Sequence, residues 1–257
     1  IPKCEQRLVV DASWQHATVV RVAPQLLVEV QEDIKGEIQV DGTPSGEVAC
    51  TGKLVLYPLE SMRASLGALG IAPRDQRFKY KVHPALSKQA WEEGLLAPRR
   101  PGDDWASVPS PLIKWQRKSS GQDLVPVALS YLRADGLASL ELELKDPAIV
   151  LEDLHIQWPL GCEVSVVSAD IGEASSHGTQ LTWQIPQLST SARRGRLELR
   201  APTGSGPMRP VHLEAASRGR TTNPIEVLEC SERETMEPVG FACERLQLYD
   251  FYFVVVN

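Results

Sequence analysis

Short segments in which apolar and polar residues alternate recur along the chain. Residues 138–145 place Leu140, Leu142 and Leu144 on one face of an extended strand and the intervening glutamates on the other. Side chains of a strand point alternately to its two faces, so this period of two predicts strands with one buried and one solvated face, which is typical of antiparallel sheets. The same alternation recurs at residues 180–185, 196–200 and 210–215.

Turn-forming residues separate these segments, at residues 41–46, 133–136, 175–178 and 203–207. Many short strands separated by such turns predict an all-β sandwich architecture. Within it Trp183, which alternates with Leu181 and Ile185, is expected to be a core residue, and Trp158 is assigned the same structural role.

A single segment, residues 84–98, has the pattern of a helix. Ser87 is placed to cap its N-terminus and Gly94 to end it, since serine side chains accept from free backbone N–H groups and glycine adopts the left-handed conformation that ends helices. The fold class expected is therefore all-β with one short helix.

Composition is ordinary for a soluble globular chain: 257 residues, 42% hydrophobic and 23% charged. No apolar run approaches the roughly 20 residues of a membrane-spanning helix. The sequence opens at Ile1 without an initiator Met or a charged-then-apolar leader, which predicts that it is part of a longer protein.

The net charge of −6 argues against nucleic acid as the main partner, because neutralising phosphates requires a concentrated basic face. The five cysteines are odd in number and widely spaced, which favours free thiols in a reducing compartment. The five histidines are equally scattered, so neither a metal site nor a cofactor is expected.

Adjacent carboxylates occur, but they do not indicate catalysis. Neighbouring residues on a strand point to opposite faces, and surface solvation explains such pairs. No nucleophile elbow, P-loop or dinucleotide fingerprint is present, so an enzyme is not expected. A β-sandwich hydrolase or lectin stays an alternative that needs a carboxylate cluster in a cleft. The pairs are Glu32/Asp33, Glu92/Glu93, Asp103/Asp104 and Glu152/Asp153.

Two segments combine basic and aromatic residues. Residues 77–82 alternate cations with Phe78, Tyr80 and Val82, and residues 114–117 set a tryptophan between two cations. A solvated outer face is the simpler explanation, and docking of an acidic peptide or of anionic lipid headgroups is the alternative. Aromatic side chains flanked by cations are typical of peptide-docking surfaces. The candidate binding residues are Arg77, Lys79, Lys81, Trp91, Lys114 and Trp115.

Taken in order, the segments resemble the mu homology domain of vesicle-coat adaptors, and most nearly the C-terminal domain of the delta subunit of the COPI coat (coatomer). The most specific local likeness is at residues 78–91, and the likeness extends from about Leu26 to Tyr252. The first two dozen residues have no clear counterpart. The matching segments are residues 27–36, 51–56, 78–91, 111–127, 151–160, 181–186 and 195–199.

The resemblance implies an elongated pair of antiparallel β-sandwich subdomains. Subdomain A comprises residues 1–117 and 207–257, and subdomain B, residues 118–206, is inserted into it. The resemblance also implies a non-enzymatic adaptor in vesicle-mediated protein transport between endoplasmic reticulum and Golgi. Such a protein is cytoplasmic, is peripheral on vesicle membranes through its coat, and contacts other coat subunits through an N-terminal part absent from this sequence.

The family's tyrosine-motif site is incomplete in this sequence. Glu29 stands near the place of its acid, but Tyr57 or its neighbours replace its lysine, and residues 244–252 lack its Trp-x-Arg. The resemblance therefore implies the other ligand class of the family, tryptophan-containing acidic peptides of tethering or Arf-regulatory proteins, bound to subdomain A. A mu homology domain of another adaptor, such as an endocytic muniscin, stays an alternative and would demand a larger basic surface.

Overall fold

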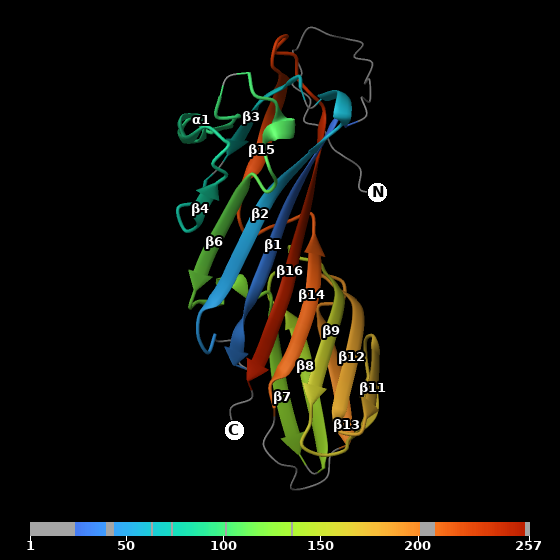
Figure 1. Ribbon diagram of the computed structural model, residues 1–257. Coiled ribbons are helices and arrows are strands. Elements are labelled where there is room, and N and C mark those ends of the chain that lie inside the picture. The colour runs from blue at the N-terminus through green and yellow to red at the C-terminus, as the bar shows by residue number, and fades with distance from the viewer. Residues whose placement is uncertain are drawn as a thin grey trace, which may run out of the picture.

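The computed structural model describes residues 24–39, 44–62, 64–72, 74–100, 102–134, 136–200 and 209–254. These residues form an elongated molecule built around one long twisted sheet, with smaller sheets at its two ends (Figure 1). The long sheet contains, in spatial order, β11 (Glu173–His177), β12 (Gln180–Leu188), β9 (Leu151–Pro159), β14 (Val211–Arg218), β16 (Phe241–Val254), β1 (Leu26–Gln39), β2 (Val48–Pro58), β6 (Ile113–Ser119) and β4 (Lys79–Val82).

Two further sheets pack at the ends. A four-stranded sheet contains β10 (Ser165–Ala169), β13 (Arg194–Arg200), β8 (Leu137–Leu144) and β7 (Val127–Ala134). A three-stranded sheet contains β15 (Glu226–Glu232), β3 (Leu66–Ala72) and β5 (Leu95–Leu96). Short 3-10 turns lie at Glu60–Met62, Trp105–Ser107 and Gln122–Leu124. The predicted all-β class is confirmed.

The alternation in the sequence corresponds to burial in the structure. In β8 the side chains of Leu140, Leu142 and Leu144 are fully buried, while Glu141 and Glu143 stay partly exposed. Trp158 and Trp183 are also fully buried, and each indole N–H donates to a backbone carbonyl. These tryptophans are core residues, as the pattern predicts.

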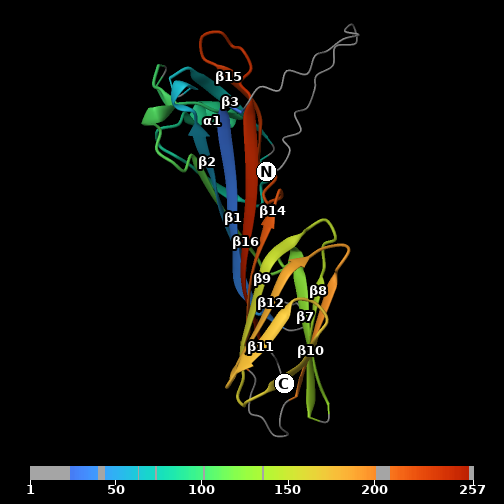
Figure 2. The same ribbon diagram turned by 90° about the vertical axis from the view of Figure 1, so that its right-hand side faces the viewer.

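One strand pair departs from the antiparallel rule. β1 and β16 run parallel from the Leu26–Phe241 pair to the Gln39–Val254 pair, and Figures 1 and 2 show them side by side along the molecule. Parallel neighbours need a long connection, and here it comprises the rest of the chain between them. Sequence alternation does not report strand direction, so this pair could not be predicted from it.

The helix α1 spans only Lys88–Glu92, shorter than the predicted segment. The Ser87 hydroxyl accepts from the Ala90 N–H, and Gly94 has φ +83°, so the predicted cap and stop are confirmed. The two leucines after the stop form β5 and pair with β3 instead of continuing the helix. No helix within the described ranges has the length and apolarity to span a membrane.

Strands β7 to β13 occupy one end of the molecule, and the chain then returns to the other end through β14 (Figure 2). β14 pairs with β9 on one side and with β16 on the other, so the long sheet is continuous from one end to the other. The division of the chain into subdomains at residues 118 and 206 stays a prediction.

Candidate functional site

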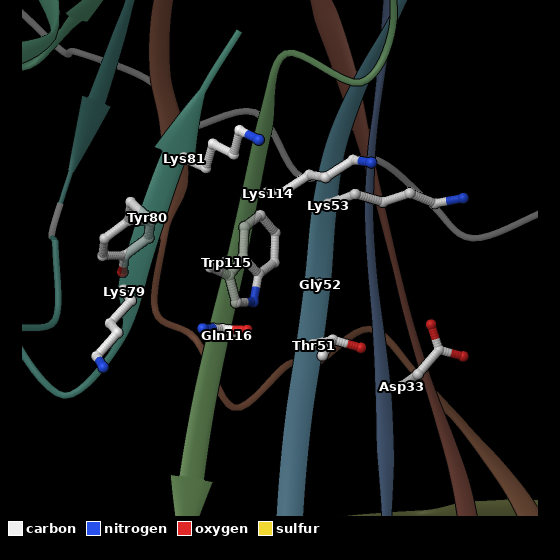
Figure 3. A pocket seen from close by; sticks show the side chains of 10 residues that line it. All are labelled: Asp33, Thr51, Gly52, Lys53, Lys79, Tyr80, Lys81, Lys114, Trp115 and Gln116. Atoms are coloured by element: carbon white, nitrogen blue, oxygen red, sulfur yellow. The ribbon is translucent and has the colours of Figure 1, made fainter.

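A hollow of about 510 Å³ lies on the sheet formed by β4, β6, β2 and β1 (Figure 3). We call it the lysine groove. It brings together residues from four strands that are far apart in the sequence. Its lining residues are Asp33, Thr51, Gly52, Lys53, Lys79, Tyr80, Lys81, Lys114, Trp115 and Gln116.

Strand register arranges the lysines in a row. Lys114 lies directly opposite Lys81 on one side and Lys53 on the other, so three ammonium-bearing side chains occupy adjacent strands at the same level. Figure 3 shows these three side chains over one end of the groove, while Lys79 points to the other end. The neighbouring row contains one lysine, one acid and two neutral residues: Lys79, Asp33, Gln116 and Thr51.

These lysines differ from the other strand cations of the long sheet in having no carboxylate partner among the described residues. Like charges directly opposite on adjacent strands destabilise a sheet, so the row has an electrostatic cost that a bound anion would remove. The five other lysines and arginines on strands of this sheet are all paired. Their pairs are Lys35–Asp250, Arg117–Asp123, Lys118–Glu47, Arg218–Glu152 and Arg245–Glu226.

Beneath the groove lies a second row, whose side chains alternate with the lysines along the strands and therefore point to the other face of the sheet. Tyr80, Trp115, Gly52 and Glu32 lie opposite one another on β4, β6, β2 and β1. The indole of Trp115 extends across Gly52, where any Cβ would overlap it, and donates to Glu32 Oε1 at 2.9 Å. Glycine is thus required at residue 52 for Trp115 to reach Glu32.

Glu32 is a buried carboxylate, with 0% of its surface exposed. Its Oε1 accepts from the Trp115 indole and from the Asn223 backbone N–H, and its Oε2 accepts from the Thr222 backbone N–H at 2.7 Å and from Gln247 Nε2 at 2.8 Å. Four donors thus compensate the desolvation of one charge. The interpretation of Glu32 as a solvated surface acid is wrong, because these donors stabilise it inside the protein.

The predicted site residues do not all come together. Lys79, Lys81 and Lys114 line the groove, and Trp115 lies beneath it with 2% of its surface exposed. The pattern that sets Trp115 between two cations predicts a ligand contact, whereas the structure places its indole in an internal hydrogen bond. Lys53 is the groove lysine that the sequence reasoning missed. It faces Lys114 across β2 and β6, and only the register of those strands reveals it.

Arg77 is engaged elsewhere. Its Nε donates to both carboxylate oxygens of Asp75, Oδ1 at 3.1 Å and Oδ2 at 2.9 Å, and its Nη2 donates to Oδ2 at 2.6 Å. The hydrogen bond to Arg77 lowers the pKa of the Asp75 carboxyl, outweighing the partial burial that raises it. Arg77 therefore has a lower capacity for a new anion than the unpaired lysines.

Trp91 lies in a second hollow of about 670 Å³, which shares no lining residue with the lysine groove. It is half-buried: its ring contacts Tyr80, with centroids 5.6 Å apart, and the Arg74 guanidinium covers it at 4.9 Å. Both apolar and polar residues line this hollow. Its lining residues are Val82, His83, Pro84, Leu86, Ser87, Lys88, Trp91, Glu92 and Arg99.

Glu29 and Tyr57, which the sequence resemblance places near a tyrosine-motif site, contact each other. The Tyr57 hydroxyl hydrogen-bonds to Glu29, which raises the tyrosine pKa. The carboxylate is thereby engaged by a neighbouring side chain. Within the described residues, no group of three His, Cys, Asp or Glu side chains is arranged to hold a metal ion.

No family model matches the sequence, and no curated protein matches it. The comparison with solved structures shows that the chain has the mu homology fold. One similar structure is the yeast delta-COP-I mu-homology domain complexed with a Dsl1 WxWxV peptide, at 17% identity and a TM-score of 0.70 over 91% of this chain and 100% of that one. The yeast domain without the peptide has the same identity and TM-score, over 91% and 99% of the chains.

The Fcho1 mu homology domain of Danio rerio, with a bound Eps15 peptide, is also similar. It is 14% identical, with a TM-score of 0.55 over 90% of this chain and 98% of that one. The TM-scores thus place this chain nearer to the yeast delta-COP-I domain than to the Fcho1 domain. At these identities the comparison establishes the fold, and the residues of the site must support the function.

Proposed function

We propose that this chain is a non-enzymatic coat adaptor domain that binds short, tryptophan-containing acidic peptides in COPI-type vesicle transport. The observation that carries the proposal is the lysine groove, because a chain of net charge −6 leaves four lysines of one hollow without a carboxylate partner in the described residues. Two solved domains of the same fold contain bound peptides, which supports peptide binding, and the peptide of the yeast domain has a WxWxV motif.

In this proposal the acidic residues of the peptide contact Lys53, Lys79, Lys81 and Lys114. Trp91 and its hollow, on the other side of the edge strand β4, provide the aromatic surface, and Trp115 supports the groove from beneath. Buried aromatic contacts provide most of the binding energy in small interfaces, whereas exposed cations mainly accelerate encounter and add dependence on salt.

A peptide containing Trp-x-Trp-x-Val with flanking acids tests the proposal. Replacing Lys79 and Lys81 by Gln is expected to weaken binding about two- to tenfold and to flatten its salt dependence, because two screened attractions are lost. Trp91→Ala is expected to weaken binding by about 30-fold or more. Titration of the labelled peptide by fluorescence anisotropy at low and high salt measures both effects.

Lys35→Gln is the matched control, because Lys35 lies on the same sheet but pairs with Asp250. It is expected to leave the affinity unchanged. Binding that is insensitive to salt, or that survives Trp91→Ala, would contradict the proposed site.

The COPI assignment implies the cellular partners: tethering or Arf-regulatory proteins that carry the peptides, and other coat subunits on ER–Golgi vesicles. Full-length tagged protein is expected to co-purify coatomer subunits from cells. Co-purification of endocytic adaptors without coatomer would favour a muniscin-type protein instead.

A further inference from the structure

We propose that one end of the lysine groove is a phosphate site, so that phosphorylation of the bound acidic peptide strengthens its binding. This inference rests on the proposed function and adds a regulation to it. The end concerned is the row formed by Lys81, Lys114 and Lys53.

The first argument is the spacing of the row. Adjacent strands lie about 4.8 Å apart, so the three lysines start from neighbouring positions across β4, β6 and β2. Alternate side chains of an extended peptide lie about 6.6 Å apart, so successive carboxylates of a peptide laid along the row do not match its period. A single phosphate instead offers three acceptor oxygens that adjacent ammonium groups can contact at once.

The second argument is charge. A phosphoserine carries about −1.5 to −2 at pH 7, whereas a carboxylate carries −1, so phosphate relieves more of the repulsion among three cations. The row contains no acid. It continues onto β1 with Gln31, which lies opposite Lys53, and the side-chain amide of Gln31 can also donate to a phosphate. Asp33, the acid of the groove, lies in the neighbouring row opposite Thr51.

The third argument is the contrast between the two rows. Lys79 is the sole lysine of its row and lies opposite the neutral Gln116. It is directed to the other end of the groove, as Figure 3 shows. Lys79 therefore supplies a general attraction for acidic peptides but not the three-lysine arrangement, which makes it the matched control for Lys114.

The test uses three peptides that differ at one position within the acidic stretch, with Ser, Glu or phosphoserine. Wild-type protein is expected to bind the phosphoserine peptide about tenfold tighter than the Ser peptide. The Glu peptide is expected to bind no more than about threefold tighter than the Ser peptide. Lys114→Gln is expected to reduce the tenfold preference to about twofold. Lys79→Gln is expected to weaken all three peptides similarly and to keep the preference.

The outcomes separate the two proposals. If the Ser peptide binds and phosphoserine adds nothing, or if Lys114→Gln keeps the full preference, the phosphate site is wrong and the proposed function stands. If none of the peptides binds wild type, the proposed function itself fails.

A last experiment measures binding of the protein to vesicles that contain phosphoinositides. Lys114-dependent vesicle binding that the phosphopeptide does not compete would overturn the peptide as the phosphate source. Unchanged thermal unfolding of both exposed-lysine variants verifies that they fold.

Discussion

Trp183→Ala is expected to lower the free energy of unfolding by about 3 to 5 kcal/mol, as large-to-small substitutions of buried aromatic residues do. The side chain is fully buried on the face of β12 that it shares with Leu181 and Ile185. Its indole N–H donates to the Ile171 carbonyl at 2.9 Å, so the substitution also removes a hydrogen bond from a buried site. Urea denaturation followed by circular dichroism measures the change.

Trp91→Ala is the comparison variant. Trp91 is half-buried against Tyr80 and the Arg74 guanidinium, so its removal is expected to cost only about 1 kcal/mol of stability while it weakens peptide binding. The two tryptophans are thus expected to separate stability from binding. The reverse pattern, in which Trp183→Ala unfolds like wild type but fails to bind peptide, would show that the structural and functional roles had been exchanged.

Glu32→Gln is expected to destabilise the protein by about 3 to 5 kcal/mol despite its nearly identical shape. Each carboxylate oxygen accepts from two donors, so an amide nitrogen at either position faces two N–H groups and leaves them without an acceptor. An unsatisfied buried donor costs about 1 to 3 kcal/mol, and disrupting a buried charge that is already compensated costs about 3 to 5 kcal/mol. Thermal and urea unfolding measure the loss.

Glu37→Gln is its matched control, on the same strand but exposed to solvent. It is expected to change the free energy of unfolding by less than about 0.5 kcal/mol. Glu32→Gln is also expected to weaken peptide binding, because one amide oxygen cannot accept from all four donors and the network that holds Trp115 under the groove is loosened. Equal stability of the two variants would mean that the four hydrogen bonds around Glu32 contribute nothing net.

The local elements could be predicted from the sequence, because the information that determines them is local. The alternation in residues 138–145 predicts β8, and Ser87 and Gly94 predict the limits of α1. Trp115 points inward on the same face of β6 as Ile113, as the alternation of that segment predicts, although its flanking cations favoured a ligand contact.

The groove could not be predicted in the same way, because it depends on pairings between distant segments. Lys53 joins Lys114 and Lys81 only through the registers of three strands. The burial of Glu32 likewise requires donors from residues 222, 223 and 247, some 190 to 215 positions away in the sequence. No local window of the sequence contains that information.

The continuity of the long sheet has a mechanical consequence. Because β14 is paired with β9 on one side and with β16 on the other, a hinge motion between the two ends would have to break a backbone ladder. A peptide held in the lysine groove and a partner bound at the far end, near β10 and β13, would therefore stay at a constant separation. The domain would act as a spacer of fixed length between whatever its two ends hold.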